Sequence, residues 1–409
     1  MLIRKWTSMS LILRICIGLV IGAALGLLLP GLAWIGTLGF LFVGALKAIA
    51  PILVFVLVAS SLANAKGGAG TGARFRRVIF LYLFSTLCAA VVAVIVNFVH
   101  PVTLSLTDVN AAEGYVAPGS MDDIIMNLLS SIIDNPVEAL ADANYIGILF
   151  WAVILGLALK YAGETTKKTM RDLADAMSMV VRWVISCAPF GILGLVFTAV
   201  SSSGLEIFTT YGELVLVLVV SMLLVALVLN PLIVGIALRE NPYPLIFTCI
   251  RQSGVTAFFT RSSAANIPVN MELCKELGLD EDMYSVSIPL GSTINMDGAA
   301  AVITTFALTA AFTVGAEITL PMAILLSIVA TFSACGTSGV AGGSLLLVPL
   351  GCSLFGITND IAMQIVGIGF IISVIQDSLE TALNSSGDVI FTATAEFMDW
   401  KKQGKKLPL

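Results

Sequence analysis

Residues 376–388 read Q-D-S-L-E-T-A-L-N-S-S-G-D, and they place three carboxylates, an asparagine and several hydroxyls inside an apolar C-terminal region. Between residues 276 and 400 the sequence contains neither lysine nor arginine. An ionised carboxylate in apolar surroundings is costly unless it is paired with a positive charge or takes up a proton. Asp377, Glu380 and Asp388 therefore face a charge deficit that their neighbours in the sequence do not relieve.

The chain around this stretch is too apolar for a soluble protein. Of its 409 residues, 58% are hydrophobic and 11% are charged, and the mean hydropathy is +1.01. Runs 11–29, 38–63 and 78–99 reach the roughly 20 residues that a helix needs to cross a bilayer. The composition predicts an all-α polytopic membrane protein. We interpret the first run as a retained helix rather than a signal peptide, because no polar domain follows it.

Lysine and arginine alternate along the chain with segments that contain neither. Residues 66–77 and 160–182 are basic, whereas residues 100–159 and 201–213 hold no lysine or arginine. Short cytoplasmic loops of membrane proteins are enriched in these two residues. The alternation places both termini in the cytoplasm and makes residues 401–409 a cytoplasmic tail.

Cysteine and histidine exclude several classes of site. The seven cysteines are an odd number and form no C-x-x-C pair, and His100 is the only histidine. A disulfide framework, a zinc site and a histidine-based catalytic triad are therefore not expected.

The two halves of the sequence differ in pattern. The first half reads as six ordinary spans, whereas after residue 240 two apolar stretches, 243–276 and 320–356, are interrupted midway by small polar residues. Each arm of these stretches is shorter than the roughly 20 residues of a spanning helix, which predicts two re-entrant helical hairpins. The six ordinary spans are approximately 11–36, 38–63, 78–99, 145–160, 182–200 and 212–238.

Each predicted hairpin is followed by a span that polar residues interrupt. The first reads G-S-T-I-N-M-D-G at 291–298 within the span 283–312, and the second reads E-T-A-L-N-S-S-G-D at 380–388 within 360–395. We expect both spans to be broken helices. The charge pattern gives the two hairpin-plus-helix units opposite orientations, and such inverted, interrupted repeats point to the central site of a transporter.

The residue types in these spans favour sodium and an amino acid as the missing charges. Arg261 is the one plausible internal base, and one arginine cannot neutralise Asp297 together with the three acids of 376–388. Asparagine, hydroxyl and backbone oxygens without histidine or cysteine suit a small hard cation such as Na⁺. A substrate ammonium on Asp377, with its carboxylate at Asn384 and at hairpin N–H groups, would supply the rest. The alternative for a single polar residue is helix–helix packing or a protonated buried acid.

Several motifs resemble the dicarboxylate/amino acid:cation symporter family, and the match covers nearly the whole chain. The resemblance implies eight transmembrane helices plus two hairpins, a homotrimer in membrane lipid, and an elevator-type movement. It also implies a scaffold of residues 1–240, to which only the span 78–99 is an exception, and a transport core of residues 241–400. The motifs are N-P-V-E-A-L-A at 135–141, A-P-F-G at 188–191, T-R-S-S at 260–263, N-M-D-G at 295–298, G-T-S-G-V at 336–340 and N-S-S-G-D at 384–388.

Residue roles follow from the same resemblance. It implies that Asp377 binds the substrate ammonium and Asn384 its carboxylate. Ser262 and Ser263 would add contacts to that carboxylate, with Thr381 nearby. The residues implied for sodium form three sets: Gly291, Asn295, Asn384 and Asp388; Tyr82, Ser85, Thr86, Asn295 and Asp297; and backbone oxygens of Thr293, Ala334, Cys335 and Thr337.

Departures from the family pattern indicate the substrate. Carriers of acidic amino acids have arginine where this chain has Glu380, and a glutamate there would repel a second carboxylate. Ala299 replaces the usual threonine, and the first hairpin tip reads S-S-A-A-N. The Q-D-S-x-E-T-A-L-N-S-S combination resembles the sodium/serine-threonine branch, in which Glu380 would accept a hydrogen bond from the substrate hydroxyl. We expect sodium-coupled import of L-serine and L-threonine across the bacterial inner membrane, without a cofactor, an enzymatic activity or a nucleic-acid partner.

Other functions remain open at this stage. Within transport, the alternative is a carrier of other small neutral amino acids such as alanine. An intramembrane aspartyl protease also needs two membrane aspartates, yet the sequence S-S-G-D at 385–388 lacks the G-x-G-D of such enzymes. A dedicated channel would not need a hairpin lid over a carboxylate-lined site.

Overall fold

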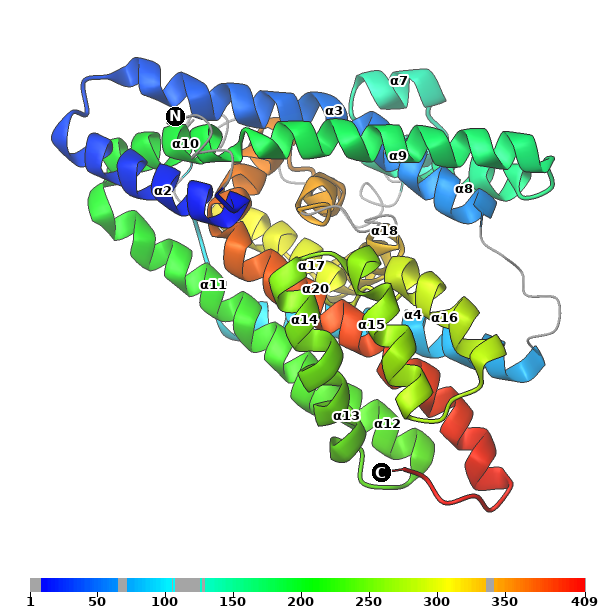
Figure 1. The fold of residues 1–409 in the computed structure, drawn as a ribbon. Coiled ribbons are helices and arrows are strands. Elements are labelled where there is room, and N and C mark those ends of the chain that lie inside the picture. Colours follow the sequence, from blue (N-terminus) through cyan, green and yellow to red (C-terminus); the bar gives the residue numbers. More distant parts are fainter. Residues whose placement is uncertain are drawn as a thin grey trace.

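A computed structural model describes residues 9–64, 72–104, 106, 126, 129–335 and 342–408, and the regular secondary structure in these residues is helical (Figure 1). The longer elements are α2 (Leu11–Leu28), α3 (Gly36–Asn64), α4 (Gly72–Val99), α7 (Pro136–Ala141), α8 (Tyr145–Leu159), α9 (Glu164–Ser186), α10 (Ala188–Ser203), α11 (Ile207–Leu224), α12 (Asn230–Leu238), α13 (Tyr243–Cys249), α14 (Val255–Thr260), α15 (Ser263–Glu276), α16 (Glu281–Ile294), α17 (Asp297–Thr313), α18 (Leu320–Ala334), α19 (Val348–Ser353) and α20 (Asn359–Lys402).

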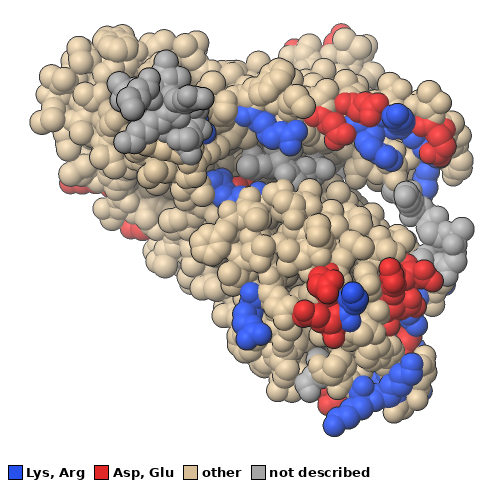
Figure 2. Space-filling view, in the orientation of Figure 1, with Lys and Arg blue, Asp and Glu red and all other residues tan. Residues whose placement is uncertain are grey.

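Apolar helices dominate the described part of the chain. Six stretches there are long and apolar enough to cross a membrane, and two shorter apolar helices, α8 and α18, accompany them. Figure 2 shows charged side chains gathered along α9 and toward the C-terminal end of the molecule, with uncharged surface over much of the face between them. The predicted all-α polytopic membrane protein is confirmed at this level.

The helices form two groups (Figure 1). In the first, α2 and α3 pack against α10, and α3 also packs against α8 and α9. In the second, α20 lies at the centre, where α12, α14, α15, α16 and α17 surround it, while α4 packs against α17, α18 and α20. The core of this second group encloses the polar residues singled out in the sequence.

Glycines let the helices of the first group cross closely. A Cβ atom built on Gly18 of α2 would lie 2.2 Å from the carbonyl oxygen of Pro189, and one on Gly22 would lie 2.4 Å from that of Leu193. Small residues at helix crossings allow such backbone approach in membrane proteins. The glycines of α2 therefore determine where this helix packs against α10.

The crossing of α3 and α10 gives a first test of this packing. A Cβ on Gly39 would lie 2.7 Å from the backbone nitrogen of Leu195 and 3.0 Å from the carbonyl carbon of Gly194. We expect Gly39→Ala to destabilise the protein by about 1–3 kcal/mol, because the backbone must shift to accept the methyl group. Thermal unfolding of the purified protein measures the effect. Gly44→Ala, on the same helix with nothing within 4 Å of the added atom, is the control; equal melting temperatures for the two variants would contradict this packing.

The segment 243–276 contains two helical arms joined by a tight turn. The first arm runs through α13, a π-helical turn (Ile250–Gly254) and α14, and the second arm is α15. Arg261 ends α14 in the left-handed conformation with φ +52°, and the Ser262 hydroxyl caps α15 by accepting from the Ala265 N–H at 3.2 Å. Both arms pack against α20. For the segment 320–356, the described parts are α18, a 3₁₀ turn (Leu345–Leu347) and α19; its central motif at 336–340 lies outside the described residues.

Of the two polar spans that are expected to be broken helices, only the first is interrupted. Between α16 and α17 the chain leaves the helix at Asn295 and Met296, whose ψ angles are 86° and 47°. The Met296 N–H released by this break donates to the Thr86 hydroxyl at 3.2 Å.

The predicted break in 360–395 is wrong, because α20 is one continuous helix. It contains no proline, and its hydroxyl side chains donate to carbonyl groups four residues earlier, as Thr381 does to Asp377 at 2.7 Å and Ser386 to Ala382 at 2.8 Å. Such back-bonding satisfies polar side chains within a helix without disrupting it. Polar residues alone are therefore insufficient to interrupt a helix.

Span boundaries also differ from the prediction, and the first span, expected over 11–36, ends as a helix at Leu28. The run 182–200 divides between α9 and α10, with the junction at Cys187. Pro189 stands in the first turn of α10, where a missing N–H costs nothing. The proline therefore starts a new helix in the middle of the apolar run.

Basic and acidic residues join α4 to the far end of α20. The Asp399 carboxylate accepts from Arg74 at 2.9 Å and from Arg77 at 2.6 Å, and Arg74 also reaches Asp280 at 3.2 Å. These ion pairs anchor the two helices on which much of the polar core depends.

Candidate functional site

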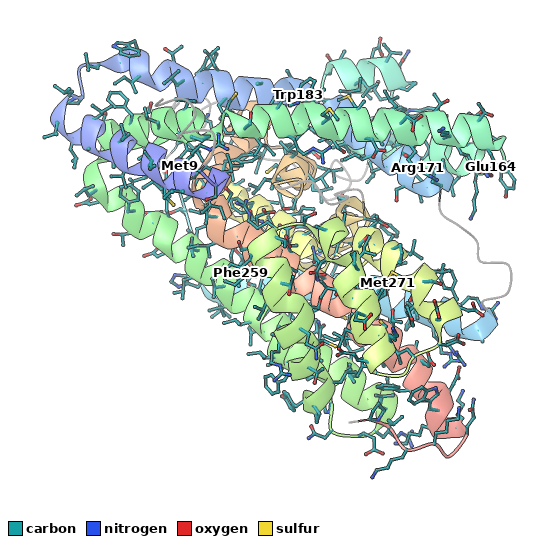
Figure 3. The ribbon with its side chains drawn as sticks, viewed as in Figure 1. Met9, Glu164, Arg171, Trp183, Phe259 and Met271 are labelled. Carbon is teal, nitrogen blue, oxygen red and sulfur yellow. The ribbon has the colours of Figure 1, made fainter. Side chains whose placement is uncertain are left out.

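The polar core lies where α20 passes the break between α16 and α17 and the turn between α14 and α15. In Figure 3, Phe259 of α14 and Met271 of α15 mark the two arms that lie over α20. Four acids meet in this core with little exposure: Asp297 is 0% exposed, Asp388 1%, Asp377 4% and Glu380 6%.

Asp377 is the acid with a basic partner. The Arg261 Nε donates to Asp377 Oδ2 at 2.6 Å, and the Gly342 backbone N–H donates to Oδ1 at 3.2 Å. The predicted internal base is thus found against the acid expected to bind the substrate ammonium. The left-handed turn at Arg261 directs α15 back along α20 and leaves the Arg261 side chain 11% exposed.

Glu380 lies one helical turn after Asp377 and faces the segment after α18. The Ser344 hydroxyl donates to Glu380 Oε2 at 2.6 Å, and the Gln376 side-chain amide donates to the same oxygen. Gly298 makes this arrangement possible, because a Cβ there would lie 2.8 Å from both the Cα and the carbonyl oxygen of Glu380. The first turn of α17 therefore presses directly on the helix that carries the two acids.

Two asparagines tie the helix break to α20. Asn384 Oδ1 accepts from the Gly298 backbone N–H at 2.7 Å, and its own carbonyl oxygen accepts from Asn295 Nδ2 at 2.9 Å. The Asn384 side chain thus satisfies the Gly298 N–H, which the interruption leaves unpaired, and Asn295 ties the break to the backbone of α20. Asn295 and Asn384 lie together, as predicted, and their side chains form hydrogen bonds with backbone groups of the protein.

Asp388 is held by neutral groups. Asn295 Nδ2 donates to Oδ1 at 3.1 Å, and Asn270 Nδ2 lies 3.5 Å from Oδ2. A Cβ on Gly291 would lie 2.7 Å from Asp388 Oδ1, so the predicted neighbour is in contact with the carboxylate. Tyr82 donates to the Asp388 backbone carbonyl at 3.0 Å rather than to the carboxylate.

Asp297 has a second set of neutral partners. The hydroxyls of Ser85 and Thr86 donate to its Oδ1 at 2.9 and 3.1 Å, and Asn230 Nδ2 donates to Oδ2 at 3.3 Å. The structure thus brings Ser85 and Thr86 of the predicted set to Asp297, whereas the Tyr82 hydroxyl reaches the Asp388 carbonyl instead. Among the described residues, neither Asp297 nor Asp388 has a salt-bridge partner.

The third predicted sodium set is only partly described. Cys335 Sγ lies 3.7 Å from the carbonyl oxygen of Ile294, which places the end of α18 beside the end of α16, next to Thr293. Thr337 lies outside the described residues. Of the two predicted hydroxyls at the first turn, Ser262 caps α15 and Ser263 is buried.

Several polar residues of this core escaped the sequence reasoning. Asn266 Nδ2 donates to the Ser385 hydroxyl at 2.7 Å and to Ser253 at 3.0 Å, and Asn270 Nδ2 donates to the Ser385 carbonyl at 3.0 Å. The spacing of Asn266 and Asn270, four residues apart on one apolar helix, is a signal for a shared buried face. The residues missed in this way are Asn230, Ser253, Asn266, Asn270, Ser344 and Gln376.

The arrangement has the chemistry of a cation site beside a zwitterion site. Asp297 and Asp388 bring two buried carboxylates, and the hydroxyls of Ser85 and Thr86 lie beside the first of them. Carboxylate and hydroxyl oxygens are ligands of hard cations. Asp377 and Glu380 lie on the same face of α20, one turn apart, near two chain segments that can supply N–H groups.

Nearly the whole chain is similar in sequence to a family of membrane transporters. Residues 11–397 match the model of the sodium:dicarboxylate symporter family. A serine/threonine transporter SstT of Bifidobacterium adolescentis is 60% identical over 98% of this chain and 93% of its own length. Proteins of the same name from Streptococcus thermophilus and Streptococcus agalactiae are 54% and 56% identical, over 98% and 96% of this chain and 99% and 97% of their own lengths.

Proposed function

Because the chain belongs to the sodium:dicarboxylate symporter family, we propose that it carries L-serine and L-threonine across the membrane together with Na⁺. Members of this family are transporters rather than enzymes, and sodium is their coupling ion. The names of the relatives at 54–60% identity supply the two amino acids, and Glu380 in place of a side-chain arginine agrees with a substrate that lacks a second carboxylate.

One observation carries the proposal: Asp297 and Asp388 are buried and have only neutral partners among the described residues. A buried charge without compensation is strongly unfavourable, so these acids call for cations. Sodium bound beside Asp297 and beside Asp388 would supply them. Ser85 and Thr86 contact Asp297, which supports their assignment to the first of these sites. Asn295 and Gly291 contact Asp388, which supports their assignment to the second.

The substrate would lie between α20, the turn at Arg261 and Ser262, and the residues Gly342 and Ser344. Its ammonium would bind the Asp377 carboxylate, either alongside Arg261 or in place of it. Its side-chain hydroxyl would reach Glu380. The substrate carboxylate would lie near Asn384 and the turn at Ser262 and Ser263. Thr381, whose hydroxyl donates to the Asp377 carbonyl, would border this space.

The finer architecture belongs to the same proposal. We place residues 1–240 in a trimeric scaffold, with α4 given to the transport core, and residues 241–400 in a core that moves like an elevator. The two segments 243–276 and 320–356 would enter the membrane as hairpins beside eight spanning helices. Both termini would lie in the cytoplasm of a bacterial cell.

Uptake into proteoliposomes tests the function directly. Labelled serine should accumulate when an inward Na⁺ gradient is imposed and should not accumulate when K⁺ replaces Na⁺ on both sides. Labelled alanine in place of serine separates this substrate pair from other small neutral amino acids. Serine uptake that is indifferent to Na⁺ would overturn the proposal.

Asp297→Asn and Asp388→Asn probe the two cation assignments. We expect each to raise the Na⁺ concentration for half-maximal serine uptake about tenfold or more, because a charged ligand of the ion is lost. The serine-to-alanine preference should change little, since substrate affinity suffers only through coupling between sites. Glu272→Gln, at a side chain that is 65% exposed on α15, is the matched control. A changed preference with unchanged Na⁺ dependence would show that the acid serves the substrate.

A further inference from the structure

Asn230 occupies an unusual point in the fold. It is the first residue of α12, directly after the π-helical turn Val225–Leu229, and Pro231 follows it. A π turn shifts the helical register by one residue, and such turns often occur at functional sites. Asn230 is 1% exposed, so this register directs a polar side chain into the core.

The Asn230 amide meets the carboxylate oxygen of Asp297 that the α4 hydroxyls do not reach. Ser85 and Thr86 both donate to Oδ1, whereas Asn230 Nδ2 donates to Oδ2 at 3.3 Å. Among the described residues, Asn230 provides the hydrogen bond to this second oxygen. α12 thereby reaches a site for which the family resemblance implies only residues of α4, of the break at Asn295 and of α17.

The other end of the same amide is unsatisfied. Asn230 Oδ1 is buried and has no hydrogen-bond donor among the described residues. Buried acceptors without partners are rare, because desolvation is then uncompensated. A half-turn of the amide about its Cβ–Cγ bond would bring this oxygen to the place that Nδ2 now holds, where a cation next to Asp297 would satisfy both the carboxylate and the oxygen.

Asn97 serves as a comparison for Asn230, because its amide is hydrogen-bonded to neutral groups and not to an acid. It is 0% exposed on α4, and its Oδ1 also lacks a donor among the described residues. Its Nδ2, however, donates to Ala93 and Thr305 at 2.8 and 3.0 Å, which are neutral groups. The two asparagines therefore share burial and chemistry, and they differ in the carboxylate beside Asn230.

We infer that Asn230 is a further residue of the Asp297 cation site, in which its side-chain oxygen is a ligand of the bound sodium. This inference rests on the proposed sodium coupling. It gives α12 a part in ion binding, so that the segment between α11 and α13 contributes to the affinity for Na⁺.

Sodium-dependent thermal stability of the purified protein, measured without substrate, tests the inference. Na⁺ is titrated against choline at constant ionic strength, and the midpoint of stabilisation is compared among variants. We expect Asn230→Leu to raise the Na⁺ midpoint about tenfold or more. Asn97→Leu should lower the melting temperature at every Na⁺ concentration and leave the midpoint unchanged.

The alternative outcomes are distinct. A role for Asn230 in packing alone predicts that its variant behaves like Asn97→Leu, and an unchanged Na⁺ midpoint would overturn the inference. If Asn230→Leu does not fold, Asn230→Ala is measured by the same titration under the same criterion. An unmodified protein that Na⁺ fails to stabilise would overturn the proposed sodium coupling and this inference together, whereas a normal response with an unshifted variant overturns the inference alone.

Discussion

Replacement of Asp377 by asparagine is expected to abolish serine binding or to weaken it by a factor of roughly 100 to several thousand. Removing one member of a buried ion pair typically costs about 3–5 kcal/mol, and each 1.4 kcal/mol corresponds to about tenfold in affinity. Asp377 is 4% exposed, and Glu380, the other acid on this face of α20, is committed to Ser344 and Gln376. The substrate ammonium would therefore lose its charge partner.

The Arg261 pair must be separated from this effect. Asp377→Asn also leaves the guanidinium of Arg261 without its carboxylate, so a loss of stability will accompany the loss of binding. Serine affinity is measured by calorimetry on protein that elutes as a folded species. The control is Arg261→Gln, which keeps Asp377 for the ammonium and should retain serine binding. Near-normal affinity in folded Asp377→Asn protein would refute the assignment.

Substitution of Glu380 is expected to change which amino acid is carried. Both hydrogen bonds to this side chain from the described residues reach Oε2, which leaves Oε1 to accept from the hydroxyl of serine or threonine. A hydrogen bond to a charged group contributes about 1.5–3 kcal/mol, so Glu380→Gln should reduce the preference for serine over alanine roughly tenfold or more. A site that hydrogen-bonds a hydroxyl discriminates well because the analogue leaves a buried group unpaired.

Glu380→Arg extends the test to charge. The Glu380→Arg protein should accept aspartate and should take up much less serine, since the local charge is reversed. Ala299→Thr combined with it restores the residue usual after N-M-D-G. Competition of labelled serine uptake by alanine and by aspartate measures all variants, and Glu272→Gln serves as the control. An unchanged ranking of competitors would show that Glu380 does not contact the substrate.

The sequence predicts the acids of this core better than it predicts their surroundings. Asp297, Asp377, Glu380 and Asp388 stand out because charges are rare in apolar stretches, and the structure buries all four. The break at Asn295 was also predicted. The break expected in 360–395 is wrong, because α20 is continuous. Small polar residues in a sequence do not reveal whether their hydroxyls donate to carbonyl groups of the same helix, as that of Thr381 does.

Partners distant in sequence were beyond local reasoning. Asn230 and Asp297 are 67 residues apart, and Arg261 and Asp377 are 116 apart. A single asparagine in a membrane helix is ordinarily a packing residue, so no local pattern distinguishes Asn230 from Asn97. Only the register set by the π turn and the packing of α12 bring the amide to the carboxylate.

The continuity of α20 has a consequence for stoichiometry. Asp377 and Asp388 are separated by 11 residues on one unbroken helix, which at about 1.5 Å per residue spans roughly 16 Å. A rigid rod fixes the spacing between the proposed amino-acid site and the proposed ion site, so whatever motion exposes one of them carries the other with it. The coupling ratio of ions to amino acid would then depend on which combinations of occupancy permit that shared motion, and no relay between independently moving parts would be required.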